Sequence, residues 1–176
     1  MTNELHDSDE NTGTMDVLER HQFDTSKLQE YMHENVNGFE GKIKLEEFKG
    51  GQSNPTYKVI TPNQSYVLRR KPPGKLLKSA HAVDREYKVI TALNKTEVPV
   101  PKSYALCEDE DIVGTSFYIM EFKDGRVLWD PAMESSDIEE ANGVYKSMND
   151  SMAKLHSVDP NEIGLEDFGK PGNYVG

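Results

Sequence analysis

The amino-acid sequence predicts an α+β fold built on a five-stranded antiparallel sheet, and three observations support this prediction. Five short segments rich in β-branched and aromatic residues are separated by turn residues, which is typical of strands joined by hairpins. Three longer segments carry apolar residues at helical spacing, and the second of them follows the third strand. The chain has 176 residues, 35% of them hydrophobic, which is enough for one domain with a sizeable core. The predicted order is helix, three strands, helix, two strands and helix.

The first helix is predicted to begin at Asp24 or Thr25, either of which can cap it, and to end near Asn37-Gly38. Its apolar stripe consists of Leu28, Tyr31, Met32 and Val36. Residues 1–20 contain many acidic and few large apolar side chains. We therefore expect a disordered acidic tail before the helix.

The next three strands are predicted at about residues 43–48, 57–60 and 66–70. The first two are joined by the stretch FKGGQSNPTYKV, residues 48–59, which contains two glycines, small polar residues and a proline. We call residues 50–54 the glycine turn. Such a turn either joins two strands or cradles phosphate with its backbone N–H groups.

A helix inserted after the third strand is predicted from about residue 81 to 93, with Val83, Tyr87 and Ile90 on its buried stripe. Two further strands, at about 103–107 and 116–122, flank an acidic turn at 108–111 that we expect to be a solvated hairpin tip. Ser136 and Glu139 suggest a capping box for the last helix. We expect the apolar stripe of that helix to be core; it consists of Ile138, Ala141, Tyr145, Met148, Met152 and Leu155.

The net charge of −11 argues against a general nucleic-acid binder, but the charge is unevenly distributed. Residues 1–40 have a net charge of −8, residues 41–102 of +8 and residues 103–176 of −11. The basic middle segment contains the glycine turn. Anion binding there and a merely solvated basic face both agree with this distribution.

Other classes of function are excluded by composition. No window approaches the roughly 18 apolar residues of a membrane span, and the N-terminus lacks the pattern of a signal peptide, so we expect a cytoplasmic protein. Cys107 is the only cysteine and cannot form an internal disulfide. We expect it to be a buried structural thiol, since no Cys/His pair has zinc-ligand spacing.

Glu86 is the most informative residue of the inserted helix. It lies next to Tyr87 and three residues after Val83, so its carboxylate should point toward the core side. Arg69 is the natural partner, because strand alternation places Val67 and Arg69 on one face and Leu68 and Arg70 on the other. The alternative is that Glu86 lies at the edge of the stripe and reaches solvent.

The segments GGQSNPTYKV, SYVLRRKPPGKLL, AHAVDREYKVITAL, VPVPK and GTSFYIMEFKDGRV together resemble the amino-terminal lobe of the protein-kinase-like fold, in the aminoglycoside phosphotransferase family. They are most similar to the phosphotransferase domain that is fused to acyl-CoA dehydrogenases in animals. The resemblance covers about residues 24–176. It implies a kinase-like nucleotide-binding lobe over residues 21–122. Residues 123–176 would then be a hinge and the first helical part of a truncated C-terminal lobe.

The resemblance also implies site residues. The glycine turn would position the nucleotide, and Arg69 would take the place of the lysine that holds the α- and β-phosphates, with Glu86 as its helix partner. Arg70 would take this role if the strand register were shifted by one. The backbone at Glu121 and Lys123 would meet the adenine edge. The nucleotide-binding residues are thus expected to be Gly50, Gly51, Gln52, Ser53, Asn54, Arg69, Glu86, Glu121 and Lys123.

The family's H-G-D-x-x-x-x-N and D-W-E-like segments do not occur in the sequence, so we assign no catalytic residue and no metal ligand. The stretch Leu155-His156-Ser157-Val158-Asp159 is expected to be a helix end. We therefore expect a fragment: the nucleotide-binding lobe of an ATP-dependent small-molecule phosphotransferase that lacks the catalytic loop. By resemblance the complete enzyme uses ATP and Mg²⁺, and its acceptor is a hydroxyl of an acyl-CoA or another small metabolite.

The expected partners are a nucleotide and a small-molecule acceptor, with neither nucleic acid nor membrane. The alternative is a non-catalytic kinase-like binding or interaction module.

Overall fold

The computed structural model describes residues 12–50, 54–74, 81–128, 130–134 and 136–169. The chain divides into two compact units, one formed by residues 1–87 and 101–127 and the other by residues 88–100 and 128–176. Residues 88–100, which the sequence assigned to the nucleotide-binding lobe, thus group with the second unit. The first unit contains the sheet and most of the predicted site.

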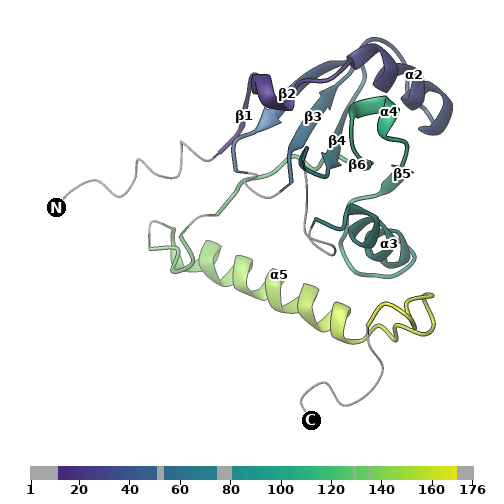
Figure 1. Ribbon diagram of the computed structural model, residues 1–176. Helices are drawn as coiled ribbons and strands as arrows, with labels where there is room; N and C mark the ends of the chain where they lie inside the picture. The colour runs from purple at the N-terminus through teal and green to yellow at the C-terminus, as the bar shows by residue number, and fades with distance from the viewer. Residues whose placement is uncertain (1–11, 51–53, 75–80, 129, 135, 170–176) are drawn as a thin grey trace. The chain divides into compact units, whose positions relative to one another are not determined.

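The sheet has six strands in the order β1-β2-β3-β4-β6-β5, and every neighbouring pair is antiparallel (Figure 1). The five predicted strands are confirmed within one or two residues, but the predicted number of strands was wrong because a short strand is added at the N-terminal edge. The bounds are β1 (Thr14–Met15), β2 (Lys44–Phe48), β3 (Thr56–Ile60), β4 (Ser65–Arg70), β5 (Ser103–Cys107) and β6 (Phe117–Glu121).

Strand β1 lies in the segment that was expected to be a disordered tail. Thr14 donates a hydrogen bond to Glu46 at 2.6 Å. Glu47 accepts the backbone N–H of Leu18 at 3.1 Å and pairs with His21 at 2.6 Å, at the end of the short 3-10 helix η2 (Glu19–His21). Local composition missed this segment because its partners are on β2, far along the chain. Residues 1–11 lie outside the described part of the chain.

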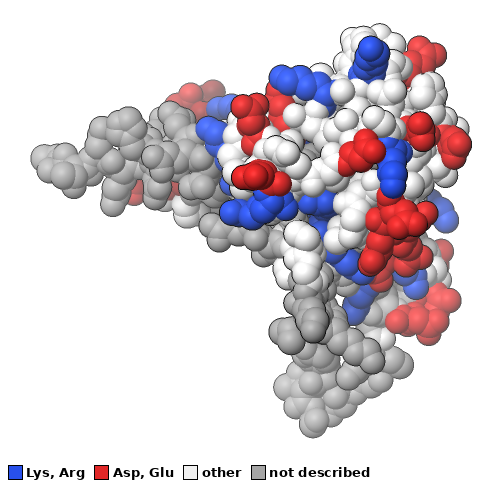
Figure 2. All heavy atoms as spheres, turned by 45° about the horizontal axis from the view of Figure 1, so that its top comes forward, with Lys and Arg blue, Asp and Glu red and all other residues white. Residues whose placement is uncertain are grey.

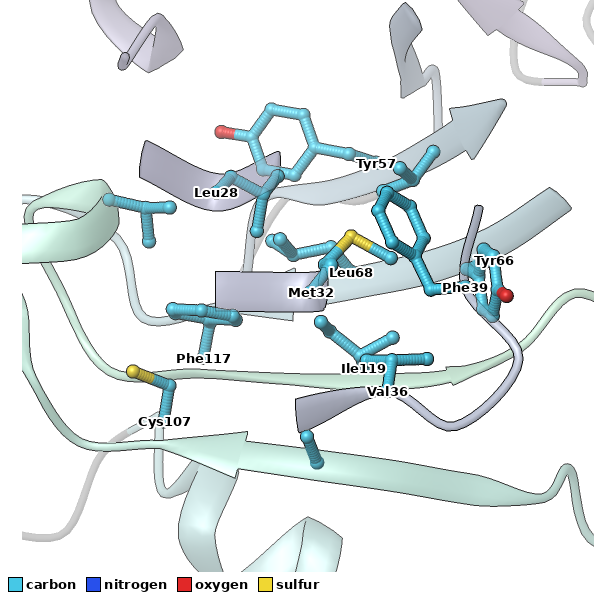
Figure 3. Packing of buried hydrophobic residues seen from close by; sticks show 13 residues of the cluster. Leu28, Met32, Val36, Phe39, Tyr57, Tyr66, Leu68, Cys107, Phe117 and Ile119 are labelled. Atoms are coloured by element: carbon cyan, nitrogen blue, oxygen red, sulfur yellow. The ribbon is translucent and has the colours of Figure 1, made fainter. Parts of the chain in front are cut away.

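Helix α2 (Thr25–Asn35) covers one face of the sheet and forms the core with it. Asp24 caps the helix by accepting the N–H of Ser26 at 2.9 Å. The predicted stripe is confirmed: Leu28 and Met32 are fully buried and meet the side chains of the sheet, as Figure 3 shows. The remaining cluster members are Val36, Phe39, Tyr57, Val59, Tyr66, Leu68, Ala105, Cys107, Val113, Phe117 and Ile119. Cys107 is buried as predicted, and burial raises the pKa of its thiol.

The acidic turn is not a bare hairpin tip. It forms the short helix α4 (Glu110–Val113), which Asp109 caps by accepting the N–H of Asp111 at 2.9 Å. Val113 joins the core cluster, and Gly114 ends the helix in the left-handed region, at φ 86°. Ile112 and Val113, which directly follow the acidic residues 108–111, pack this helix against the core. The prediction overlooked this apolar pair because it considered only the acidic residues.

The inserted helix α3 (Val83–Leu93) begins two residues later than predicted and ends where predicted. Its first turn lies on the face of the sheet opposite α2, because Glu86 reaches Arg69 on that face.

Helix α5 (Ile138–His156) in the second unit was predicted correctly, but its surroundings were not. Asp137 caps it by accepting the N–H of Glu140 at 2.8 Å, in place of the predicted Ser136. Its large apolar side chains are exposed, so the prediction that they form core was wrong for this chain: they are Ile138, Tyr145, Met148, Met152 and Leu155. Helical spacing shows which side chains share a face, but not whether another element covers that face.

The stretch 155–159 ends α5 as predicted, with the Ser157 N–H bonded to the Ala153 carbonyl at 3.0 Å. Of the helices in the described residues, none is long and apolar enough to cross a membrane.

Candidate functional site

The two neighbouring arginines of β4 lie on opposite faces of the sheet. Arg70 is on the core face with Leu68 and is only 3% exposed. Its guanidinium donates to the carbonyls of Val113 at 2.6 Å and His21 at 2.9 Å, and it lies over the rings of Phe23 and Tyr57. Arg70 is therefore a core arginine, and the alternative register that gave it the phosphate role was wrong.

Arg69 lies on the other face and forms the predicted pair with Glu86. Its Nε donates to the Glu86 carboxylate at 2.8 Å, and its Nη1 donates to the Thr56 hydroxyl at 3.0 Å. The side chains of Arg69 and Glu86 are 30% and 35% exposed, so the pair is formed but remains open to solvent. Within the described part of the chain, the Nη2 group of Arg69 makes no hydrogen bond.

Glu86 has two further donors. Asn54 Nδ2 donates to Oε1 at 3.2 Å, and Tyr118 Oη donates to Oε2 at 3.0 Å. Burial, and then the negative charge of Glu86, raises the pKa of Tyr118, so the phenol stays a protonated donor. Asn54 in turn meets His81, whose Nδ1 lies 2.7 Å from Asn54 Oδ1.

Neither His81 nor the orientation of Asn54 was expected from the sequence. His81 is in the segment AHAVDREYKV, but the hydrogen-bond partner of a polar side chain just before a helix cannot be predicted from its position in the sequence. Asn54 was expected to face the phosphates from the glycine turn, yet its side chain is turned toward Glu86 and only 3% of the residue is exposed. Gly51, Gln52 and Ser53 lie outside the described residues, so their phosphate-binding role stays a prediction.

An apolar strip lies beside Arg69 on the same face. Strand register places Lys58 opposite Val67 and Val67 opposite Met120. Beyond it, the rings of Phe48 and Phe122 stack with centroids 6.4 Å apart, and Lys58 Nζ lies 4.1 Å from the centroid of the Phe122 ring. An apolar strip next to a cationic fork fits a ligand that joins a ring system to an anion.

The predicted hinge is fixed by its own side chains. The backbone N–H of Glu121 is bonded to the Lys102 carbonyl at 2.8 Å. The Glu121 carboxylate binds Lys123 Nζ at 2.7 Å and accepts the Lys102 N–H at 3.1 Å, and these contacts lower the pKa of its carboxyl. Because its N–H is already in use, the predicted contact of the Glu121 backbone with the adenine edge would have to come from its carbonyl oxygen. The backbone contacts of Glu121 and Lys123 with adenine stay predictions.

Among the described residues, no group of three or more His, Cys, Asp and Glu side chains is placed to hold a metal ion. On the face that Figure 2 presents, acidic and basic side chains are intermingled and form no single-sign patch. A cavity of about 390 Å³ elsewhere in the first unit is lined by Arg70 and parts of α2 and α4, and it includes neither Arg69 nor Glu86.

Comparison with known proteins gives consistent matches. Residues 44–175 match the model of the phosphotransferase enzyme family. The chain is 47% identical over 166 residues to "Probable acyl-CoA dehydrogenase IBR3" of Arabidopsis thaliana, covering 90% of this chain and 20% of that protein. It is 38% identical over 165 residues to "Acyl-CoA dehydrogenase family member 11" of Rattus norvegicus, covering 92% and 21%. The chain thus spans about a fifth of the length of these relatives.

A solved structure agrees in fold. The crystal structure of a candidate aminoglycoside phosphotransferase from Ralstonia eutropha JMP134 superposes with a TM-score of 0.76 at 50% identity, over 87% of this chain and 44% of that one. Together with the matched family model, this likeness confirms the resemblance noted in the sequence. The chain belongs to the phosphotransferase enzyme family and has its kinase-like α+β fold.

Proposed function

We propose that this chain forms the nucleotide-binding lobe of an ATP-dependent phosphotransferase that acts on a small-molecule hydroxyl. The observation that carries the proposal is the Arg69 guanidinium, which Glu86 and Thr56 hold on two sides while its Nη2 makes no hydrogen bond to a described residue. A fork fixed in this way binds phosphate oxygens without first having to become ordered. The adjacent strip of Val67 and Met120 supports a base beside the phosphates.

In this proposal each part of the lobe has one task. Arg69 binds the phosphates, the described glycine Gly50 and its neighbours in the glycine turn let backbone N–H groups approach them, and Glu121 and Lys123 meet the base through their backbone. When bound, Mg²⁺ supplies neutralisation of the charge between the phosphates. The residues described here only bind and orient the nucleotide.

The acceptor is proposed from the relatives. The curated relatives carry the names of acyl-CoA dehydrogenases over a much longer chain, which favours a hydroxyl of an acyl-CoA or another small metabolite. The cytoplasmic location expected from the sequence stays a prediction.

A non-catalytic binding module is the second candidate, because the printed sequence contains no H-G-D-x-x-x-x-N segment. Both candidates bind nucleotide at the same face, and they differ in whether the complete protein transfers phosphate.

The test is an NMR titration of the chain with Mg·ATP, followed by an assay for ADP formation with a hydroxyacyl-CoA. We expect amide shifts concentrated at Val67 to Arg69 and at Tyr118 to Lys123, and no turnover above a buffer control, because positioning and charge stabilisation supply nearly all of the rate in phosphoryl transfer. Shifts confined to the core face around Arg70 and Val113 would refute the nucleotide site. Turnover that survives repurification would show that a catalytic group lies in this chain.

A further inference from the structure

The Arg69–Glu86 pair is one side of a closed ring of hydrogen bonds. Asn54 Nδ2 donates to Glu86, Arg69 Nε donates to Glu86, and Arg69 Nη1 donates to Thr56. The Thr56 hydroxyl then donates to the backbone carbonyl of Asn54 at 3.0 Å, which closes the ring. Asn54 is therefore held twice, by its side chain and by its backbone, at the C-terminal end of the glycine turn.

The chemistry of the ring fixes the roles of its atoms. A carboxylate only accepts hydrogen bonds, so the Asn54 atom that faces Glu86 must be the amide nitrogen. The amide oxygen of Asn54 then faces His81, and His81 must carry a proton on Nδ1 to donate to it at 2.7 Å. His81 thus tethers the ring from outside, just before α3, in the left-handed backbone conformation with φ 61°.

Both oxygens of Glu86 are occupied by this arrangement. Oε1 accepts from Asn54, and Oε2 accepts from Arg69 and Tyr118. The Glu86 side chain is 35% exposed. Without the hydrogen bond from Asn54, its carboxylate could therefore rotate and turn Oε1 toward water. The plane of the Arg69 guanidinium would rotate with it, because Arg69 Nε is bonded to the same carboxylate.

We propose that Asn54 and His81 are positioning residues, which hold Glu86 and so aim the Nη2 edge of Arg69 at the nucleotide phosphates. The proposal rests on the proposed nucleotide-binding function. It also changes the role of Asn54 from a phosphate contact to a link between the glycine turn and helix α3. Neither residue touches the nucleotide through its side chain in this arrangement.

The ring is tested first without nucleotide, by NMR of the wild-type chain at a pH where imidazole is neutral. We expect the His81 ring to show the Nδ1-protonated tautomer, and the Arg69 Nε–H to give a resolved, slowly exchanging signal. In Asn54→Asp, which places a carboxylate against Glu86, the Arg69 Nε–H signal should be lost, whereas the His81 tautomer should be kept, because the aspartate oxygen still accepts from Nδ1. Asn35→Asp is the matched control, because Asn35 bonds only the Tyr31 carbonyl on the exposed side of α2. An Nε2-protonated His81 in the wild-type chain would overturn the proposal.

The second test is the affinity for Mg·ATP. A hydrogen bond to a charged group is worth roughly tenfold in an equilibrium constant, so Asn54→Asp should weaken binding by about 5–10-fold while Asn35→Asp leaves it unchanged. His81→Gly relieves the left-handed backbone but removes the donor, whereas His81→Asn keeps a donor and tolerates that backbone. Binding should therefore be weaker in His81→Gly than in His81→Asn.

The outcomes separate this proposal from the proposed function. If all variants bind Mg·ATP as the wild-type chain does, the positioning roles are wrong and the nucleotide site stands. If the wild-type chain shows the ring signatures but binds no Mg·ATP, both are overturned. If Asn54→Asp does not fold, as judged by its amide spectrum, the two His81 variants still decide, since His81 lies outside the ring.

Discussion

Arg69 and Arg70 are adjacent and chemically identical, yet the alternation of β4 gives them different roles. Arg70 binds two backbone carbonyls inside the core, whereas Arg69 is partly exposed and binds Glu86 and Thr56. We expect Arg70→Lys to lower the free energy of unfolding by about 2–4 kcal/mol, because lysine cannot satisfy both carbonyls and strands a buried charge. Arg69→Lys should cost at most about 1 kcal/mol. Urea unfolding of the two variants checks this, and equal costs would contradict the assignment of the faces.

The sequence predicted the Arg69–Glu86 pair because strand alternation and helical spacing act over two elements that can be recognised locally. It did not predict the ring around the pair. Asn54 and His81 lie outside the helices and strands. There, no helical or strand periodicity relates the position of a residue in the sequence to the direction of its side chain. Their partners are set by the way the end of the turn meets the start of α3, which only the assembled fold decides.

At the scale of elements, the segment that follows β1 is held to the sheet by the buried carboxylate of Glu47. Glu47 accepts from Leu18 and pairs with His21. Glu47→Gln should lower the free energy of unfolding by about 1–3 kcal/mol, because a hydrogen bond to a charged group is lost in a buried place. It should also speed hydrogen exchange at the Lys49 N–H, which donates to the Gly13 carbonyl across β1 and β2. Asp150→Asn, in an exposed pair with Lys146, is the control; an unchanged Lys49 exchange rate would argue against this anchor.

The exposed stripe of α5 predicts a different response from that of a core helix. Met148 and Met152 are 56% and 54% exposed, so replacing both with Gln should change the free energy of unfolding of this chain by no more than about 0.5 kcal/mol each. Leu28→Ala in α2, where the side chain is fully buried, should cost about 2–5 kcal/mol. Chemical denaturation compares them. A large cost at the methionines would mean that another surface covers α5 in solution.

The helices and strands could largely be predicted because each has a local period, but their surroundings could not. The stripes of α2 and α5 are alike in sequence, but Leu28 and Met32 of the first are buried, whereas Met148 and Met152 of the second are exposed. The prediction for the segment around β1 was wrong in the opposite sense: a polar stretch that was expected to be disordered is ordered by contacts with the distant carboxylate of Glu47. Whether another element covers a helix face, and which distant residues pair, depends on the assembled fold and cannot be read from local composition.

At the scale of the whole molecule, buried tyrosines should limit stability in alkali. Burial raises the pKa of Tyr57 to about 12 from an ordinary value of 10.0, and burial also raises the pKa values of Tyr31 and Tyr118. Because the folded-state pKa lies above the unfolded one, the stabilisation is complete below about pH 10 and is lost as the pH rises toward the folded value. The free energy of unfolding should therefore show no loss from these tyrosines between pH 7 and 9 and fall above about pH 10. A chain that keeps its full stability at pH 11.5 would show that the phenols ionise without unfolding.

The most direct test of the nucleotide site is the affinity of the chain for Mg·ATP, measured by NMR titration at two salt concentrations. We expect a dissociation constant no tighter than about 1 mM, equivalent to about −4 kcal/mol, because the described residues offer an apolar strip and one cationic fork but no group of three or more metal-ligating side chains. Binding should weaken with salt. It should also weaken about fivefold or more in Arg69→Ala, while Lys44→Ala, which removes a positive charge at an exposed pair, should leave it unchanged. A micromolar constant, or equal binding by the wild-type chain and Arg69→Ala, would contradict this picture of the site.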